Sequence, residues 1–326
     1  MPLSYLELIL LFLVMAVSTR FVVDTFDRLV SGLSMKGRVA VAAILVALST
    51  SLPELFVTLA SVIEKKPEIA LGTLLGSNVA DLSIVIGGAT LIGGALPTIG
   101  DYWRWELSAA FVAGIAPILL MMDGQLSRLD GVILLTIYAI YLSDLVIDGR
   151  KKRLAKTGVS HAGIISRLRA GRYKRDGGLV LRLIVGIVTL IISGDLLVRV
   201  GADLALSWAV PVAVVGLLVI SVGTTLPEFL LSIGAIAEKN VALVLGNLLG
   251  SIVTNATLIV GLLALLSPFE VRKMDNYALV NIAFVVIFGL FWLFTSSRKK
   301  LERWEGLVLV GLFFVFAGLV LLLPSL

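Results

Sequence analysis

Long apolar stretches separated by short polar links run through the whole sequence of 326 residues. Each stretch is close to or above the roughly 20 residues that a helix needs to cross a bilayer. The pattern therefore predicts ten membrane-crossing helices, at residues 4–22, 39–63, 69–92, 105–122, 129–147, 178–198, 210–236, 241–266, 277–294 and 306–323.

Composition and charge placement agree with this pattern. The chain is 59% hydrophobic and only 15% charged, and it has no cysteine, which excludes disulfides and thiolate metal sites. Most lysines and arginines fall on the side of the membrane that holds residues 148–177. The positive-inside rule then predicts that this loop is cytoplasmic and that both termini lie outside. This topology explains the basic residues, and we do not expect nucleic-acid binding.

The second stretch, residues 39–63, carries Pro53 and Glu54 near its middle. A charged residue at mid-bilayer costs about 2.5–3.5 kcal/mol on insertion scales, and proline removes a helix hydrogen bond. The same pair recurs mid-span at Pro227 and Glu228. Two buried carboxylates beside two broken helices predict a cation site in a transporter.

The recurrence belongs to a longer repeat, because residues 45–87 align without a gap on residues 219–261. Five crossings are an odd number, so the two copies run through the membrane in opposite directions, with their sites near the midplane. We predict an all-α polytopic membrane protein of two inverted five-helix repeats, with broken helices 2, 3, 7 and 8 at the centre. The predicted division is residues 1–147, a basic cytoplasmic loop at 148–177, and residues 178–326.

Hydroxyl, amide and carboxylate residues in each copy are spaced four apart, on one face of a helix. The pairs are Thr50/Glu54, Thr224/Glu228, Ser77/Asp81 and Ser251/Asn255. Such a set selects hard cations, and calcium takes six to eight oxygens. Zinc and copper prefer imidazole or thiolate, which these segments lack. Two glutamates balance one divalent ion, and an empty, fully ionised site is unfavourable, as an obligate exchanger requires.

Other polar residues leave alternatives open. Asp81 either ligates a cation directly or is protonated and hydrogen-bonded to a backbone carbonyl. Asp144 and Asp195 lie near segment ends and are interpreted as interfacial or pore-lining. The lone histidine, His161, fits a solvated loop residue better than a proton or metal sensor.

At these residues the chain resembles the cation/calcium exchanger superfamily, and most of all its prokaryotic sodium/calcium exchangers. Their repeats resemble G-[ST]-[ST]-L-P-E followed by G-N-x-x-G-S-N, and the resemblance covers essentially the whole chain. Two positions depart from the pattern: Ser49 replaces the usual glycine and Thr73 the usual asparagine. The aspartate is in the first copy, as Asp81, with Asn255 opposite. These departures leave the counter-ion and the stoichiometry open.

The resemblance implies that the first and sixth helices slide over a fixed core. It also implies a role for each matching position. The implied roles are central calcium ligands for Glu54 and Glu228, backbone carbonyl ligands beside them for Thr50 and Thr224, sodium-site hydroxyls for Ser51, Thr225, Ser77 and Ser251, outer sodium-site carbonyls for Ala47 and Ser221, and a central polar pair for Asp81 and Asn255.

We therefore expect an inner-membrane secondary antiporter that exchanges calcium for sodium by alternating access, with calcium/proton exchange as the alternative. A membrane hydrolase is disfavoured because no histidine or lysine in the core could activate a serine. The chain has no phosphate-binding loop motif, so ATP drive is not expected, and matched inverted broken helices favour a carrier over a channel. Transported cations and lipids are the expected partners, without a cofactor, and a monomer is compatible with this reading.

Overall fold

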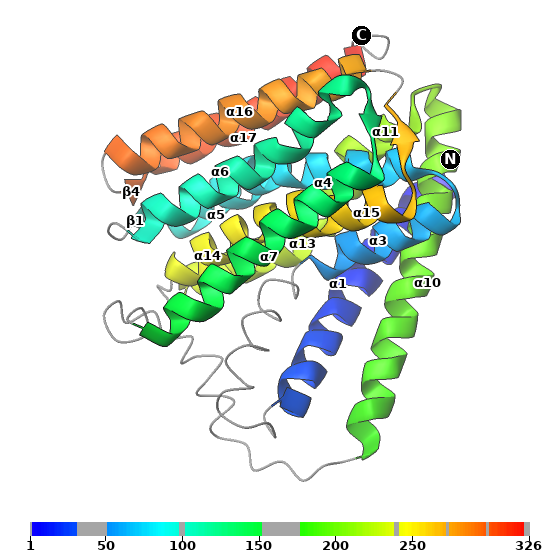
Figure 1. Cartoon of the computed structure of the whole chain (residues 1–326), viewed down its shortest axis with the longest axis horizontal. Coiled ribbons are helices and arrows are strands. Elements are labelled where there is room, and N and C mark those ends of the chain that lie inside the picture. The colour runs from blue at the N-terminus through cyan, green and yellow to red at the C-terminus, as the bar shows by residue number, and fades with distance from the viewer. Residues whose placement is uncertain are drawn as a thin grey trace.

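The computed structural model describes residues 2–30, 51–97, 102–151, 177–237, 241–271, 274–297 and 300–322. Within these ranges, eight helical spans are long and apolar enough to cross a membrane. A helix lies at each of the ten predicted positions, which confirms the all-helical membrane fold (Figure 1). The principal helices are α1 (Pro2–Val30), α3 (Leu52–Ile63), α4 (Pro67–Ala80), α6 (Tyr102–Leu120), α7 (Arg128–Lys151), α10 (Gly177–Trp208), α13 (Leu226–Ala237), α14 (Val241–Val253), α16 (Met274–Ser297) and α17 (Arg303–Leu322).

The seventh helix is broken at Thr225, as the proline predicts. Its first part comprises α11 (Val212–Val215), the π-helical segment η3 (Gly216–Ile220) and α12 (Ser221–Thr224), and α13 begins one residue later. Pro227 is the second residue of α13, and Pro53 is the second residue of α3. The missing N–H is harmless in a first turn because the first N–H groups of a helix have no partner within it.

The third and eighth helices are interrupted by π-helical segments instead of gaps. The segment η1 (Asp81–Val85) joins α4 to α5 (Ile86–Gly93), and η4 (Thr254–Ile259) joins α14 to α15 (Val260–Leu266). Insertions of this kind are frequent at functional sites. Both begin within a residue of the aligned polar pair Asp81 and Asn255, so the irregular backbone is repeated as well as the sequence.

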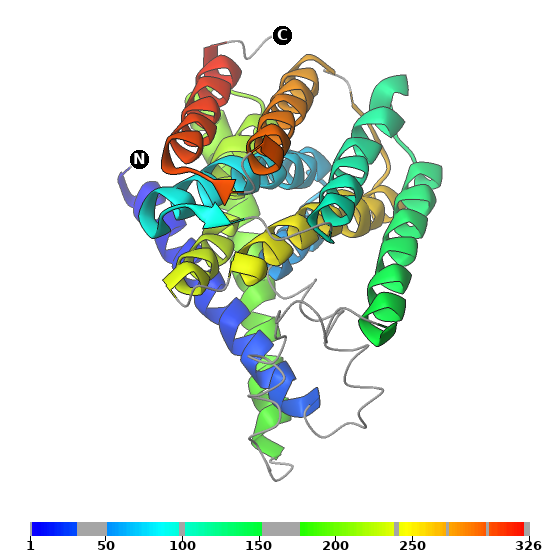
Figure 2. The ribbon, with the colours of Figure 1, turned by 90° about the vertical axis from the view of Figure 1, so that its left-hand side faces the viewer.

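The helices α1 and α10 form a separate pair at the edge of the bundle. They lie side by side and extend beyond the other helices in both views (Figures 1 and 2). A hydrophobic cluster made by Phe12 and Met15 of α1, Leu190 and Leu197 of α10, and Val57 of α3 joins the pair to the bundle. A second cluster, which includes the buried rings of Phe284, Phe288 and Phe291 on α16, fills the bundle itself.

The continuous helix Pro67–Gly93 shows that the two copies run in opposite directions. The chain turns from α3 into α4 at residues 64–66, beside the first residue of this helix. The end of α13 lies beside its last residue, because a side chain at Gly93 would collide with Ile236. α3 and α13 therefore lead from the middle of the bundle toward opposite ends.

Two short antiparallel strand pairs each join a loop of the first copy to a loop of the second. β1 (Leu96–Pro97), after the third helix, pairs with β4 (Lys300–Leu301), between the ninth and tenth. β2 (Gln125–Leu126), between the fourth and fifth helices, pairs with β3 (Phe269–Glu270), after the eighth. Each pair joins loops that the predicted alternation puts on one side of the membrane. The pairings agree with the alternation and leave open which side is cytoplasmic.

Close helix crossings also recur in the two copies. A Cβ built at Gly87 would lie 2.7 Å from the carbonyl oxygen of Gly306, where the third and tenth helices cross. A Cβ at Gly131 would lie 2.8 Å from the carbonyl oxygen of Gly261, where the fifth and eighth cross. Small residues let membrane helices approach this closely. The two crossings hold the inner helices of both copies in equivalent positions.

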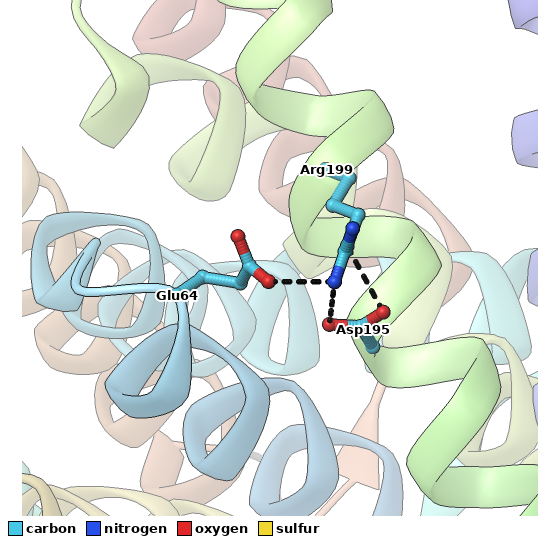
Figure 3. A network of polar contacts seen from close by, with 3 residues as sticks. All are labelled: Glu64, Asp195 and Arg199. Carbon is cyan, nitrogen blue, oxygen red and sulfur yellow. Dashed lines mark hydrogen bonds and ion pairs between the residues drawn. The ribbon is translucent and has the colours of Figure 1, made fainter.

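The sixth helix is longer than the predicted 178–198, because α10 continues to Trp208. The prediction ended before Arg199, where the apolar run is interrupted. In the structure, Arg199 is ion-paired with Asp195 at 3.0 Å and with Glu64, at the end of α3, at 2.9 Å (Figure 3). This pairing makes the charge tolerable, and it gives Asp195 a partner on the half-exposed surface of α10.

The division at residues 148–177 stays a prediction. α7 runs into this segment as far as Lys151, and α10 begins at Gly177. Residues 152–176, including His161, lie outside the described part of the chain.

Candidate functional site

The two glutamates are buried at matching places in the two copies. Glu54 is the third residue of α3 and Glu228 the third residue of α13, and each is 1% exposed. The first turn of a helix presents unpaired N–H groups and the positive end of its dipole, which stabilise a carboxylate. The Leu-Pro-Glu sequence thus starts a helix inside the bundle and places an acid at its positive end.

Residues from both copies meet at Glu54. The hydroxyl of Ser77 on α4 lies 3.4 Å from Oε1 of Glu54 and 3.4 Å from the hydroxyl of Thr224 on α12. Ser77 is fully buried and Thr224 is 1% exposed. The first copy therefore contributes a carboxylate and a hydroxyl, and the second contributes a hydroxyl, at one place in the interior.

Asp81 adds a third carboxylate to this region. It lies one turn beyond Ser77, at the start of η1, and its charge interacts with those of Glu54 and Glu228. Among the described residues, neither oxygen of Asp81 has a hydrogen-bond partner, and one oxygen of each glutamate also lacks one. Unpaired oxygens this deeply buried are costly unless a cation, a proton or water satisfies them.

The predicted sodium-site residues Ser51 and Thr225, and Ser221, which was predicted to contribute its backbone carbonyl, are also buried, and their hydroxyls differ in hydrogen bonding. The hydroxyl of Ser51 has no partner among the described residues. Ser221 donates to the carbonyl of Leu217, and Thr225 donates to that of Val222 at 3.1 Å. A hydroxyl that donates its proton in this way still has lone pairs with which to bind a cation.

The amide of Asn255 is buried in η4 and its Oδ1 is unpartnered among the described residues, at the position that aligns with Asp81. Ser251 is buried one turn earlier, in α14. Thr50 and Ala47 lie outside the described residues.

The chemistry of this site is that of oxygen donors. The described part of the chain contains no cluster of three or more histidine, cysteine or acidic side chains arranged to hold a metal ion. The oxygen donors that the described residues offer here are carboxylates, hydroxyls and the amide of Asn255. Such mixed oxygen shells are typical of calcium and other hard cations.

Sequence reasoning missed two features. One is a second repeated motif, Leu126 to Gly131 in the first copy and Leu301 to Gly306 in the second, which both read L-x-R-x-[DE]-G. Its acid caps a helix: Asp130 accepts from the backbone N–H of Ser127 and Glu305 from that of Glu302, both at 2.7 Å. A search for repeats with one inserted residue would have found it.

The second missed feature is a pair of buried hydroxyls, Thr58 and Ser232, one turn beyond the glutamates. They occupy aligned positions in the repeat. They were overlooked because the alignment was judged by identical residues, and these two are only alike.

Inverted halves, buried carboxylates at internal helix starts and a fully helical bundle together define a membrane transporter for cations. Comparison with known proteins agrees. The family model described as sodium/calcium exchanger protein matches residues 3–145 and 178–322. The chain belongs to this sodium/calcium exchanger family, within the cation/calcium exchanger superfamily, and it is not an enzyme.

Relatives and solved structures extend this assignment. Inner membrane protein YrbG of Escherichia coli is 28% identical over 311 residues, covering 92% of this chain and 93% of its own. The sodium/calcium exchanger MaX1 of Methanosarcina acetivorans is 25% identical over 300 residues, covering 83% and 85%.

Two solved exchangers share the fold. The sodium-calcium exchanger NCX_Mj, soaked with sodium and strontium, matches with a TM-score of 0.61 at 21% identity, covering 97% of this chain and 98% of its own. The H+/Ca2+ exchanger CAX matches with a TM-score of 0.71 at 14% identity, covering 98% and 86%.

Proposed function

We propose that this cation antiporter exchanges calcium for sodium by alternating access. One observation carries the proposal. Each inverted half buries one glutamate at an internal helix start, and the hydroxyl of Ser77 lies near both Glu54 of its own half and Thr224 of the other half. Two carboxylates balance one divalent ion or two monovalent ions. Either load neutralises charges whose burial is otherwise costly, so the empty site disfavours the return step and transport is coupled.

The proposed ligand shell follows the repeat. Glu54 and Glu228 bind calcium through their carboxylates, and Asp81 with Asn255 completes the polar centre between the halves. The flanking sodium positions use oxygens from the other predicted residues. These are the backbone carbonyls of Thr50, Thr224, Ala47 and Ser221 and the hydroxyls of Ser51, Thr225, Ser77 and Ser251.

Calcium/proton exchange is the second candidate. It is favoured by Asp81, whose two buried oxygens have no partner among the described residues and are available to a proton. Proteins similar to this chain include exchangers that use either counter-ion. MaX1 is named a sodium/calcium exchanger, and the CAX structure is that of an H+/Ca2+ exchanger. Only the counter-ion differs between the two proposals.

Transport from loaded vesicles separates them. Purified protein in proteoliposomes is loaded with radioactive calcium and diluted into media that impose either a sodium gradient or a pH gradient. We expect calcium efflux to follow the sodium gradient and to ignore a pH gradient of equal size. Efflux that follows only the pH gradient would replace sodium by the proton, and efflux that follows neither would reject both.

We further propose that the protein lies in the inner membrane, with residues 148–177 in the cytoplasm, both termini outside, and repeats at 1–147 and 178–326. The basic residues within this loop support the orientation, and YrbG is named an inner membrane protein. Because the chain has no cysteine, a single cysteine can be placed at His161 or at Asp123, and a membrane-impermeant thiol reagent can be added at one face of the membrane at a time. We expect His161→Cys to react only from the cytoplasm and Asp123→Cys only from outside.

A further inference from the structure

A stripe of buried oxygens continues from each glutamate along its helix. On α3, Thr58 and Ser61 follow Glu54 by four and seven residues, which places all three on one face. On α13, Ser232 follows Glu228 by the same four residues. Thr58 is 1% exposed, and Ser61 and Ser232 are fully buried.

None of these three hydroxyls has a hydrogen-bond partner among the described residues. This is unusual, because a buried serine or threonine in a helix commonly donates to the carbonyl three or four residues back. Thr73, Thr90 and Thr257 do so in the same bundle. The aligned positions Thr58 and Ser232 both forgo this bond, so the two copies share an unsatisfied oxygen at one place.

The stripe on α3 runs along the boundary between the two hydrophobic clusters. On one side, Leu55 and Val62 pack against the cluster that fills the bundle. On the other, Val57 and Ala60 belong to the cluster shared with α1 and α10. A polar line between two separately packed bodies can be hydrated or occupied by an ion without breaking either core.

The two stripes point in opposite directions. α3 leads from Glu54 to the turn beside Pro67, and α13 leads from Glu228 to the end of the helix at Gly93. Thr58 is therefore one turn from the glutamates toward one membrane face, and Ser232 is one turn from them toward the other.

We propose that Thr58 and Ser232 are the first oxygen donors on two cation paths, one to each face of the membrane, and that Ser61 extends the path along α3. The proposal rests on the proposed function and adds to it the route of the ion. Each hydroxyl replaces a water of the hydration shell as the cation enters or leaves the glutamates, and a passing alkali or alkaline-earth cation suits such neutral oxygens.

The natural absence of cysteine allows a direct test. Thr58→Cys and Ser232→Cys are prepared singly in the full chain, and each is exposed to a membrane-impermeant cationic thiol reagent from one face at a time. We expect each cysteine to react from one face only, the two faces to be opposite, and calcium to slow both reactions. Val57→Cys, at the same depth on α3 but packed toward α10, is the matched control and should not react from either face.

Reaction of both cysteines from the same face, or of neither from any face, would overturn the proposal. Transport gives a second measurement. Thr58→Val should raise the calcium concentration for half-maximal exchange by about five-fold at one face and leave the other within about two-fold, as expected for one lost hydroxyl contact. Thr58→Ser should behave like the unaltered protein.

An equal rise at both faces after Thr58→Val would place the hydroxyl in the binding site and contradict a path. Failure of the proposed function would give a different combination of transport and labelling results. If the unaltered protein moved no calcium against sodium or protons, the labelling pattern would still report whether two opposite paths exist.

Discussion

The two copies of the repeat share a framework but differ in their polar residues. The Leu-Pro-Glu helix starts, the π-helical segments at Asp81 and Thr254, the glycine crossings and the strand pairs each occur twice in the described part of the chain. At the centre, however, Asp81 of the first copy corresponds to Asn255 in the second, and Thr73 corresponds to Asn247. The helical framework around the site is therefore repeated in both copies, whereas the third carboxylate occurs in the first copy only.

The glutamates test the symmetric part, and they carry the largest expected effect. Glu54→Gln and Glu228→Gln each remove one of two negative charges while keeping the shape of the side chain. Removing one partner of a buried ion pair, here a carboxylate bound to the cation, costs about 3–5 kcal/mol. We therefore expect exchange to fall by more than about 100-fold in either variant. Calcium flux in proteoliposomes measures this, with the exposed Glu270→Gln as control. If only one of the two variants lost transport, the two halves would not share the ion equally.

Asp81 tests the asymmetric part. In Asp81→Asn the third carboxylate is gone while both glutamates remain, so calcium should still bind but the flux coupled to the counter-ion should fall by about ten-fold. The double variant Asp81→Asn/Asn255→Asp moves the charge to the other copy and should recover most of the flux. Isotope exchange and coupled flux, measured side by side, separate binding from coupling. A double variant no better than Asp81→Asn would mean that the position of the charge matters as much as its presence.

The glycine crossings test whether the framework is equally important in the two halves. Leucine at Gly87 or at Gly131 would collide with the backbone of the helix that crosses it. Overpacking of this kind costs about 1–3 kcal/mol, and we expect both variants to unfold at lower denaturant concentrations in detergent. Gly289→Leu, on an exposed face with open space around it, is the matched control. Destabilisation confined to one half would show that the two crossings are not equivalent.

The ion pairs between α10 and α3 have the smallest expected effect. Arg199 is largely exposed and bridges Glu64 and Asp195 (Figure 3), and exposed pairs contribute about 0–1 kcal/mol. Arg199→Gln should therefore change stability by less than about 1 kcal/mol and lose even that difference at high salt. A large loss of exchange with unchanged stability would instead assign these pairs to the transport cycle.

Sequence alone predicted what is local or repeated. The length and polarity of the segments predicted the helices, and Pro53 with Glu54, matched by Pro227 with Glu228, predicted the helix starts inside the membrane. The four-residue spacing of Ser77 and Asp81 also predicted that both belong to the candidate site.

Contacts between distant residues could not be predicted in the same way. The pairing of β2 with β3 involves only two residues from each of two remote loops, which is too short to leave a pattern. The continuation of α10 past the predicted end at residue 198 depends on the ion pair between Arg199 and Glu64, which lies at the end of α3. Thr58 and Ser232 are ordinary residues in the sequence. They stand out only once the hydrogen bonds are known, because neither hydroxyl has a partner among the residues that the structure describes.

In the proposed site, one divalent cation is held between glutamates from opposite halves of the protein. A crystal of the protein soaked in strontium, with anomalous data collected at its absorption edge, tests this most directly. We expect a strong peak in contact with carboxylate oxygens of both Glu54 and Glu228. A peak bound elsewhere, with these two side chains free of it, would show that the cation is not held between the two halves.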